Sequence, residues 1–192
     1  MAVTPNLVAG SILTASQVNQ YMINSGLVYI SGATFSITNA SPLNLDNVFT
    51  STFDNYLLTF QNVTSASGTT EVQLQWRASG VTTTSGYFIA YQGYSSAGAT
   101  YNKNNNGSAV AIDVALAETA AGSGSSVVNI MTPKTTGQPA AWGQLFAQGP
   151  GYYVNRNGGG ALNAGTDFDG MTLRASASTI TGSYTLYGYR KA

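Results

Sequence analysis

A chain of 192 residues is long enough for one domain with its own core, and its formal charge is zero, from seven basic and seven acidic residues. Charged residues make up only 7% of the chain, so no basic patch is available to neutralise phosphates and nucleic-acid binding is not expected. The chain contains no Cys and no His, which excludes zinc sites of the usual type and catalysis by a Ser–His or Cys–His pair, and no cofactor is expected.

The first predicted element is a short helix inside a terminal arm that spans residues 1–30. Thr14 is a suitable N-cap, and Gln17, three residues later, completes a capping box. Gly26 favours the end of the helix, because glycine adopts the left-handed conformation without steric cost. The body of the protein is then expected to occupy residues 31–192 as one β-sandwich domain.

Three apolar side chains, Val18, Tyr21 and Met22, fall on one face of this predicted helix. An isolated helix shorter than about 12–15 residues is marginal in water, so this one must dock on something. We predict that Val18, Tyr21 and Met22 form an assembly interface with a neighbour; the alternative is that the helix packs on the body of its own chain. No signal peptide and no membrane span are predicted, because the sequence lacks the long apolar run that either requires.

The clearest predicted strand is 71–77, in which apolar and polar residues alternate strictly. Alternation of this kind is typical of a strand with one face on the core and the other in water. The inward residues are then Val72, Leu74 and Trp76. The residues predicted to face water are Glu71, Gln73, Gln75 and Arg77.

Strand and turn signals continue to the end of the chain. The other predicted strands are 56–63, 87–94, 109–116, 127–131, 141–147, 171–175 and 184–189, with a short apolar run at 27–30. Loops are predicted by composition, notably at 102–108 (NKNNNGS), 155–160 (NRNGGG) and 165–170 (GTDFDG), with tight turns at the two Asn-Gly pairs, Asn106-Gly107 and Asn157-Gly158. Residues 114–121 are interpreted as a strand that ends in a loop or a short helical turn.

This pattern predicts the fold class. About eight strands with Gly-rich loops and no βαβ spacing indicate an all-β protein, a two-sheet antiparallel sandwich with a short N-terminal arm and helix. A jelly roll is the favoured version of that sandwich.

Paired carboxylates are the remaining route to catalysis, with Asp167 and Asp169 as the main candidates and Asp54 and Glu71 elsewhere. In an extended segment, Asp167 and Asp169 point to the same side, so they could serve a glycosidase or hold a cation such as Ca²⁺. Asp and Gly are also what an ordinary turn requires. The plain turn is the favoured reading, so we expect no catalytic residues and no enzyme activity.

Tyrosine is abundant, with 12 in the chain. Tyr87, Tyr91, Tyr94 and Tyr101 lie close together in the sequence, among Asn and Gln residues. Exposed tyrosines in such a setting could form a ligand surface that stacks on sugar rings, or a subunit interface. They are equally consistent with half-buried strand residues.

Three segments resemble virion proteins of tailed bacteriophages. VAGSILTASQVNQYMINSGLVYI (8–30) is similar to their N-terminal segment, with a glycine, a short LTA-x-Q-x-N helix and a strand. VFTSTFDNYLLTFQNVTSASGTTEVQLQWRASG (48–80) is similar to them in its DNY strand, Ser/Gly loop and alternating strand ending in Arg. TITGSYTLYGYRKA (179–192) resembles their C-terminal segment.

The resemblance implies a jelly-roll β domain in a homotrimer, within the virion and made in the host cytoplasm. The expected function is that of a non-enzymatic structural protein, a tail fibre or tail-associated receptor-binding subunit anchored through its N-terminal helix. Its expected partners are other virion proteins and a host surface glycan, without membrane insertion. A capsid decoration (cement) protein is the first alternative, and a free carbohydrate-binding module is the second.

Overall fold

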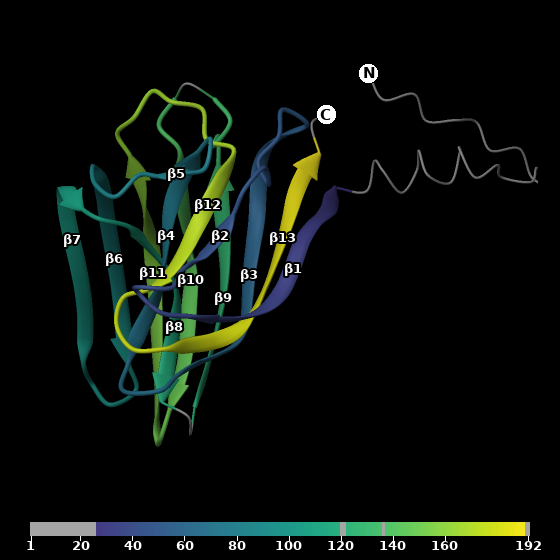
Figure 1. Cartoon of the computed structure of the whole chain (residues 1–192). Coiled ribbons are helices and arrows are strands. Elements are labelled where there is room, and N and C mark those ends of the chain that lie inside the picture. Colours follow the sequence, from purple (N-terminus) through teal and green to yellow (C-terminus); the bar gives the residue numbers. More distant parts are fainter. Residues whose placement is uncertain (1–25, 120–121, 136, 191–192) are drawn as a thin grey trace, which may run out of the picture.

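The computed structural model describes residues 26–119, 122–135 and 137–190. Within these ranges the protein consists of strands and connecting loops, so its all-β class is confirmed (Figure 1). The described ranges contain no helix that is long and apolar enough to span a membrane. The predicted helix after Thr14, with Val18, Tyr21 and Met22, lies outside the described residues.

The described residues form thirteen strands, more than the sequence pattern predicts. In chain order they are β1 (Leu27–Ile37), β2 (Leu43–Leu45), β3 (Phe53–Ser65), β4 (Thr70–Ala78), β5 (Val81–Thr82), β6 (Tyr87–Ser95), β7 (Thr100–Ala109), β8 (Ile112–Thr119), β9 (Ser123–Met131), β10 (Ala140–Gly149), β11 (Tyr152–Leu162), β12 (Gly170–Ala175) and β13 (Ile180–Arg190).

These strands belong to one large, open, mixed sheet that is mostly antiparallel. Its longer section runs in the order β1-β13-β3-β9-β10-β11-β6-β7, and its shorter section runs β2-β12-β4-β8, with β5 paired to β4. The sections are joined by a short parallel pairing of β3 with β8, in which Thr64 lies opposite Glu118. In Figure 1, β1 and β7 stand at opposite sides of the molecule.

The core lies where β4, β8 and β12 approach the longer section of the sheet. Trp76 is fully buried there, with its ring 5.9 Å from that of Phe49 and 6.0 Å from that of Phe168. A smaller cluster between β8, β10 and β11 contains Leu116 and Leu145. Fully burying large apolar side chains stabilises a fold by roughly 1.5–3 kcal/mol each, so these clusters hold the shorter section on the longer one.

The predicted inward face of β4 is confirmed, because Val72, Leu74 and Trp76 are fully buried. The prediction that its polar face lies in water is wrong. Gln73, Gln75 and Arg77 are each less than 9% exposed. Gln73 donates a hydrogen bond from Nε2 to the carboxylate of Asp113 on β8 (2.9 Å). Gln75 donates from Nε2 to the backbone carbonyl of Val110 (2.9 Å). Arg77 donates from Nε to the carboxylate of Asp46 (2.8 Å). Neighbouring segments thus cover this face and supply a hydrogen-bond acceptor to each of these three side chains.

Two predicted loops are strands instead. Residues 102–108 belong to β7, an edge strand paired with β6, and residues 155–160 belong to β11, which pairs with β10 and β6. Asn106-Gly107 is therefore not a hairpin turn: Gly107 has a φ of 82° beside a shift in the β6–β7 register, as in a bulge. Asn and Gly disfavour strands locally, but in this fold their backbone groups find partners on neighbouring strands.

The other boundaries agree more closely. Residues 114–119 of the ambiguous 114–121 segment belong to β8, so this part is strand, while residues 120–121 lie outside the described ranges. The 163–169 segment connects β11 to β12 without regular structure, as predicted for GTDFDG. β1 crosses the predicted domain boundary at residue 30 and pairs with β13.

Candidate ligand-binding site

The outward face of β9, β10, β11, β6 and β7 carries unusually large side chains for an exposed surface. On β10, Trp142 and Phe146 point outward and are 50% and 40% exposed, whereas Leu145 between them is fully buried. The period-two alternation of the strand separates these faces. Large apolar side chains gathered on an exposed sheet face are typical of a binding surface.

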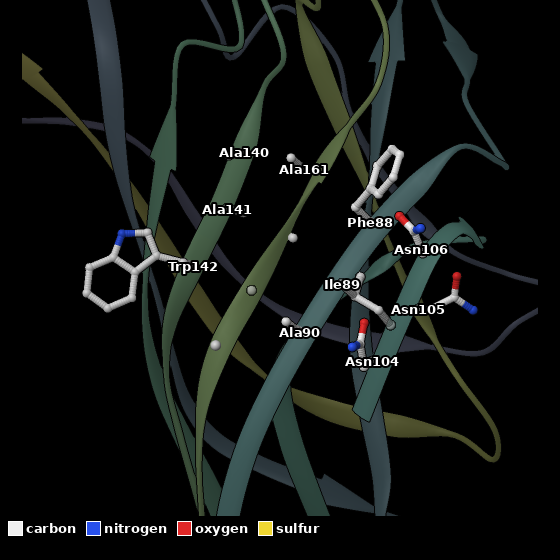
Figure 2. Close-up of a pocket in the computed structure, with 13 residues that line it drawn as sticks. Phe88, Ile89, Ala90, Asn104, Asn105, Asn106, Ala140, Ala141, Trp142 and Ala161 are labelled. Carbon is white, nitrogen blue, oxygen red and sulfur yellow. The ribbon is translucent and has the colours of Figure 1, made fainter. Parts of the chain in front are cut away.

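A groove of about 760 Å³ crosses this face. A volume of this size falls within the range of ordinary ligand sites. Figure 2 shows Trp142 on one side of the groove and Phe88, Asn104 and Asn106 on the other. Its lining residues are Phe88, Ile89, Ala90, Asn104, Asn105, Asn106, Ala140, Ala141, Trp142, Gly158, Gly159, Gly160 and Ala161.

The register of the strands explains why the groove runs across them. Trp142 on β10 lies opposite Gly159 on β11, and Gly159 lies opposite Ala90 on β6. Ala90 in turn lies opposite Asn104 on β7. Small residues on two neighbouring strands therefore form a floor between Trp142 at one end and Asn104 at the other. We call this row, Trp142–Gly159–Ala90–Asn104, the trough.

Glycine is required in the floor of the trough. A Cβ on Gly159 would lie 2.1 Å from the carbonyl oxygen of Ala141 and 2.6 Å from Cβ of Trp142. Both distances are far shorter than van der Waals contact, so any side chain at residue 159 would push β10 and β11 apart.

A row of amide side chains borders the trough. Gln144, Asn157, Gln92 and Asn102 lie opposite one another in succession on β10, β11, β6 and β7, and all four are exposed. We call this row the amide ladder. Each amide offers both donors and an acceptor, and consecutive members stand about 4.8 Å apart, the spacing of neighbouring strands.

The groove carries no ionic side chain, because its thirteen lining residues are apolar, glycine or asparagine. Lys103 lines an adjoining hollow, but its Nζ forms an ion pair with Asp113 (2.6 Å). Trp142 also lines a second hollow, of about 480 Å³, on its other side, together with Asn129 and Tyr189. Chemically, this surface suits an uncharged ligand that has apolar faces and many hydroxyl groups.

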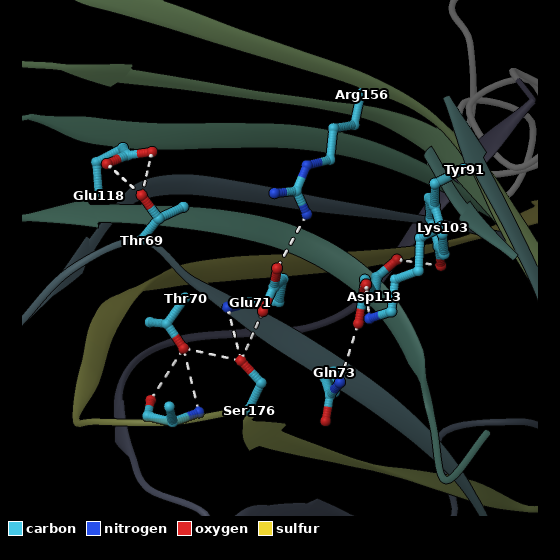
Figure 3. A network of polar contacts seen from close by, with 11 residues as sticks. Thr69, Thr70, Glu71, Gln73, Tyr91, Lys103, Asp113, Glu118, Arg156 and Ser176 are labelled. Atoms are coloured by element: carbon cyan, nitrogen blue, oxygen red, sulfur yellow. Dashed lines mark hydrogen bonds and ion pairs between the residues drawn. The ribbon is translucent and has the colours of Figure 1, made fainter. Parts of the chain in front are cut away.

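A separate polar cluster connects side chains of β4 and β8 with side chains of β7 and β11 (Figure 3). Arg156 on β11 donates from Nη1 to Glu71 on β4 (2.9 Å), and Glu71 also accepts a hydrogen bond from Ser176 (2.7 Å). The ring of Tyr101 lies 4.7 Å from the Arg156 guanidinium carbon, which is cation–π geometry. Because its acids and bases are paired with one another, this cluster joins β4 to β11 and β7.

Hydrogen bonds and charge set the pKa of Glu71. Burial alone would raise this pKa, but hydrogen bonds from Ser176 and Arg156, with the positive charges of Arg156 and Lys103, outweigh burial and lower it below 4.5. The ionised carboxylate therefore stabilises the folded state above the unfolded pKa, and this contribution is lost as the pH falls through the folded pKa.

We expect Glu71→Gln to flatten the acid limb of the stability profile. The wild-type free energy of unfolding should fall more steeply than that of the variant between about pH 5 and pH 3, because only the wild type must protonate this carboxylate. Urea titrations at a series of pH values measure the difference. Parallel profiles for the two proteins would contradict the assigned role of Glu71.

The four predicted ligand tyrosines occupy different environments. Tyr87 and Tyr91 are 0% and 6% exposed, and their hydroxyls donate to the carbonyls of Thr83 and Asp113 (both 2.8 Å). Burial raises the pKa of each, so both remain protonated donors. These two are therefore core residues and cannot stack on an external ligand. Tyr94 is 62% exposed, and Tyr101 is half-buried on Arg156.

The candidate carboxylates do not form a cluster. Asp167 is exposed, while the carboxylate of Asp169 accepts a hydrogen bond from the backbone N–H of Ser79 (3.2 Å). Among the described residues, no group of three acidic side chains is placed to hold a metal ion. The hydrogen bond between Ser79 and Asp169 links the residue directly before β12 to the turn between β4 and β5.

Sequence reasoning missed the groove and the ion pairs. The AWGQLFA run of 141–147 did contain a signal, since small or apolar residues alternate with Trp142, Gln144 and Phe146. Nothing local shows, however, that Ala90 and Asn104 lie in line with Trp142, or that Arg156 reaches Glu71.

Comparisons of the chain with protein-family models, with curated proteins and with solved structures find no match.

Proposed function

We propose that the protein is a non-enzymatic structural protein of a tailed-bacteriophage virion, namely a tail fibre or tail-associated receptor-binding subunit. The observation that carries this proposal is the uncharged outward face of β10, β11, β6 and β7, where aromatic and amide side chains border a groove. Hydrogen bonding to neighbours on both sides holds β10, β11 and β6 in place, so this face is organised before any ligand arrives.

The fold that we propose for this subunit is a two-sheet sandwich of the jelly-roll type. The short section β2-β12-β4-β8 packs its apolar residues on the longer section, and among the described strands the β3–β8 pairing that joins the two sections is only two residue pairs long. The charged clusters support a non-enzymatic role, because Glu71 and Asp113 are engaged in ion pairs with Arg156 and Lys103.

The layout of the molecule suits a subunit that is anchored at one edge and binds at the other. The backbone N–H of Arg190 donates to the carbonyl of Gly26 (2.9 Å), so the N- and C-terminal ends of the described body meet beside β1 and β13. The groove lies across β10, β11, β6 and β7, toward the opposite end of the strand order. Gly26, the first described residue, lies beside β13 at the β1 end of this order, and we propose residues 14–25, with Val18, Tyr21 and Met22, as the attachment to other virion proteins.

We further propose a homotrimer, because a chain with only 7% charged residues and a formal net charge of zero has little self-repulsion to oppose association. Light scattering should then give three times the chain mass of 19.9 kDa. A monomer at high concentration would contradict the trimer without bearing on the location in the virion.

Labelling and adsorption test the proposed function together. Antibodies against residues 27–190 should decorate tails in electron micrographs of the particle, and the purified full-length protein should bind cells that support its propagation and compete with adsorption of the particle. Related resistant cells serve as the control. Label confined to the capsid shell would favour a decoration protein, and binding to cells without any label on particles would favour a free carbohydrate-binding module.

A further inference from the structure

We infer that the trough binds an extended neutral glycan, a chain of uncharged pyranose units lying across β10, β11, β6 and β7. This inference rests on the proposed receptor-binding function and names the ligand class of the same face. Three features carry it: the exposed indole, the amide ladder, and the absence of ionic groups from the lining.

Trp142 supplies a platform for one sugar ring. Its side chain is 50% exposed and lines hollows on two sides, so the ring is accessible to a ligand. One face of a pyranose consists of C–H groups, which are apolar and slightly positive. The face of an indole is apolar and slightly negative, so the two stack favourably. The Gly159–Ala90 floor beside the indole leaves room for the rest of the ring and for the next unit.

The amide ladder supplies hydroxyl recognition. Gln144, Asn157, Gln92 and Asn102 each present a donor and an acceptor to solvent, which matches hydroxyl groups that also donate and accept. Their repeat of about 4.8 Å, set by the strands, is comparable with the advance of one sugar unit in an extended chain. A single sugar would contact only part of this row, so the site favours an oligosaccharide.

The absence of charged side chains from the groove lining favours neutral glycans over acidic ones. An acidic glycan would place carboxylates or sulfates in a groove whose lining offers amides and apolar atoms without a cation. Lys103, the cation of the adjoining hollow, is already paired with Asp113. Desolvating a charged sugar there would lack compensation.

The two tryptophans allow a direct test on the full-length protein. Trp76 is 0% exposed and Trp142 is 50% exposed, so acrylamide quenching of the fluorescence reports chiefly on Trp142. The probes are glucose, mannose and galactose oligosaccharides of increasing length from the monosaccharide upward, with polygalacturonate and sialyllactose as charged counterparts. We expect a neutral oligosaccharide to protect Trp142 from quenching and its affinity to rise with chain length.

Variants locate the binding. Calorimetry with the best neutral probe should show at least about tenfold weaker binding for Trp142→Ala, a difference well above experimental error. Gln92→Ala should give a smaller loss. Phe146→Ala is the matched control, because Phe146 lies on the same face of β10, stacks on Tyr153 and does not line the groove. This control should bind like the wild type.

Other results would overturn the inference: no protection by any neutral probe, tighter binding of a charged probe, a monosaccharide that binds as tightly as the longest chain, or equal losses for Phe146→Ala and Trp142→Ala. Dissociation of the oligomer by Trp142→Ala would assign the face to contacts between copies of the chain instead.

Failure of the trough assignment can be distinguished from failure of the proposed function. If the wild-type protein adsorbs to cells but binds no neutral glycan, only the trough assignment is overturned. Glycan protection without adsorption or label on particles would support the trough and remove the virion role.

Discussion

Replacing Arg156 with leucine is expected to lower the free energy of unfolding by about 3 kcal/mol, because the change leaves the largely buried Glu71 carboxylate without its cation. The side chains of Arg156 and Glu71 are 11% and 20% exposed. Leucine preserves apolar volume under the sheet, yet it removes the charge that lowers the pKa of Glu71 and the partner of the Tyr101 ring. The loss should extend to β7, since Tyr101 lies on that strand.

A double variant separates lost charge pairing from lost packing. Glu71→Gln combined with Arg156→Leu removes the carboxylate as well, so it should be more stable than Arg156→Leu alone. Urea unfolding of the wild type, both single variants and the double variant completes the cycle. A double variant whose destabilisation equals the sum of the two single changes would show that Glu71 and Arg156 do not stabilise one another.

Deleting residues 1–25 is expected to abolish incorporation into the particle and to leave the β body folded. The buried apolar residues of the described body run from Phe35 to Leu186 and pack on one another, so the described strands supply a core of their own. If the predicted helix docks as proposed, burial of Val18, Tyr21 and Met22 contributes roughly 1.5–3 kcal/mol each to attachment, and the deletion removes all of it.

Circular dichroism measures the folding of the truncated protein, and complementation of particle assembly measures its incorporation. Val18→Ser with Met22→Ser should reproduce the assembly defect in the full chain. Gln20→Ala with Asn24→Ala is the matched control, because these residues fall on other faces of the predicted helix. Normal assembly of the truncated protein would show that this segment is not the anchor, and an unfolded truncated protein would show that the body requires it.

The sequence determined the all-β class and the inward face of β4. Val72, Leu74 and Trp76 alternate with polar residues, and the period of a strand is a local property that any window of the chain displays. For the same reason the sequence predicts two strands, 87–94 and 171–175, close to the observed bounds of β6 and β12. The loop predicted at 165–170 is confirmed for 165–169, since Gly and Asp favour turns through local backbone preferences, whereas Gly170 begins β12.

Only the tertiary structure decided what covers each face and which polar segments are strands. Gln73 and Arg77 alternate as exposed residues should, but segments distant in the sequence bury them and supply their partners. Residues 102–108 and 155–160 have loop composition, and they are extended because β6 and β10 offer backbone partners. Hydrogen bonding between strands depends on register, which no local window contains.

The trough is the clearest product of that register. Trp142, Gly159, Ala90 and Asn104 come from four strands in the order β10, β11, β6 and β7, and only the pairing of those strands sets them in line. A shift of one residue in any pairing would turn the next side chains outward and break the row, because successive residues of a strand point to opposite faces. The outward side chains of single strands can therefore be predicted from the sequence. Their alignment into one uncharged groove cannot, because it depends on pairing between residues as far apart as Ala90 and Gly159.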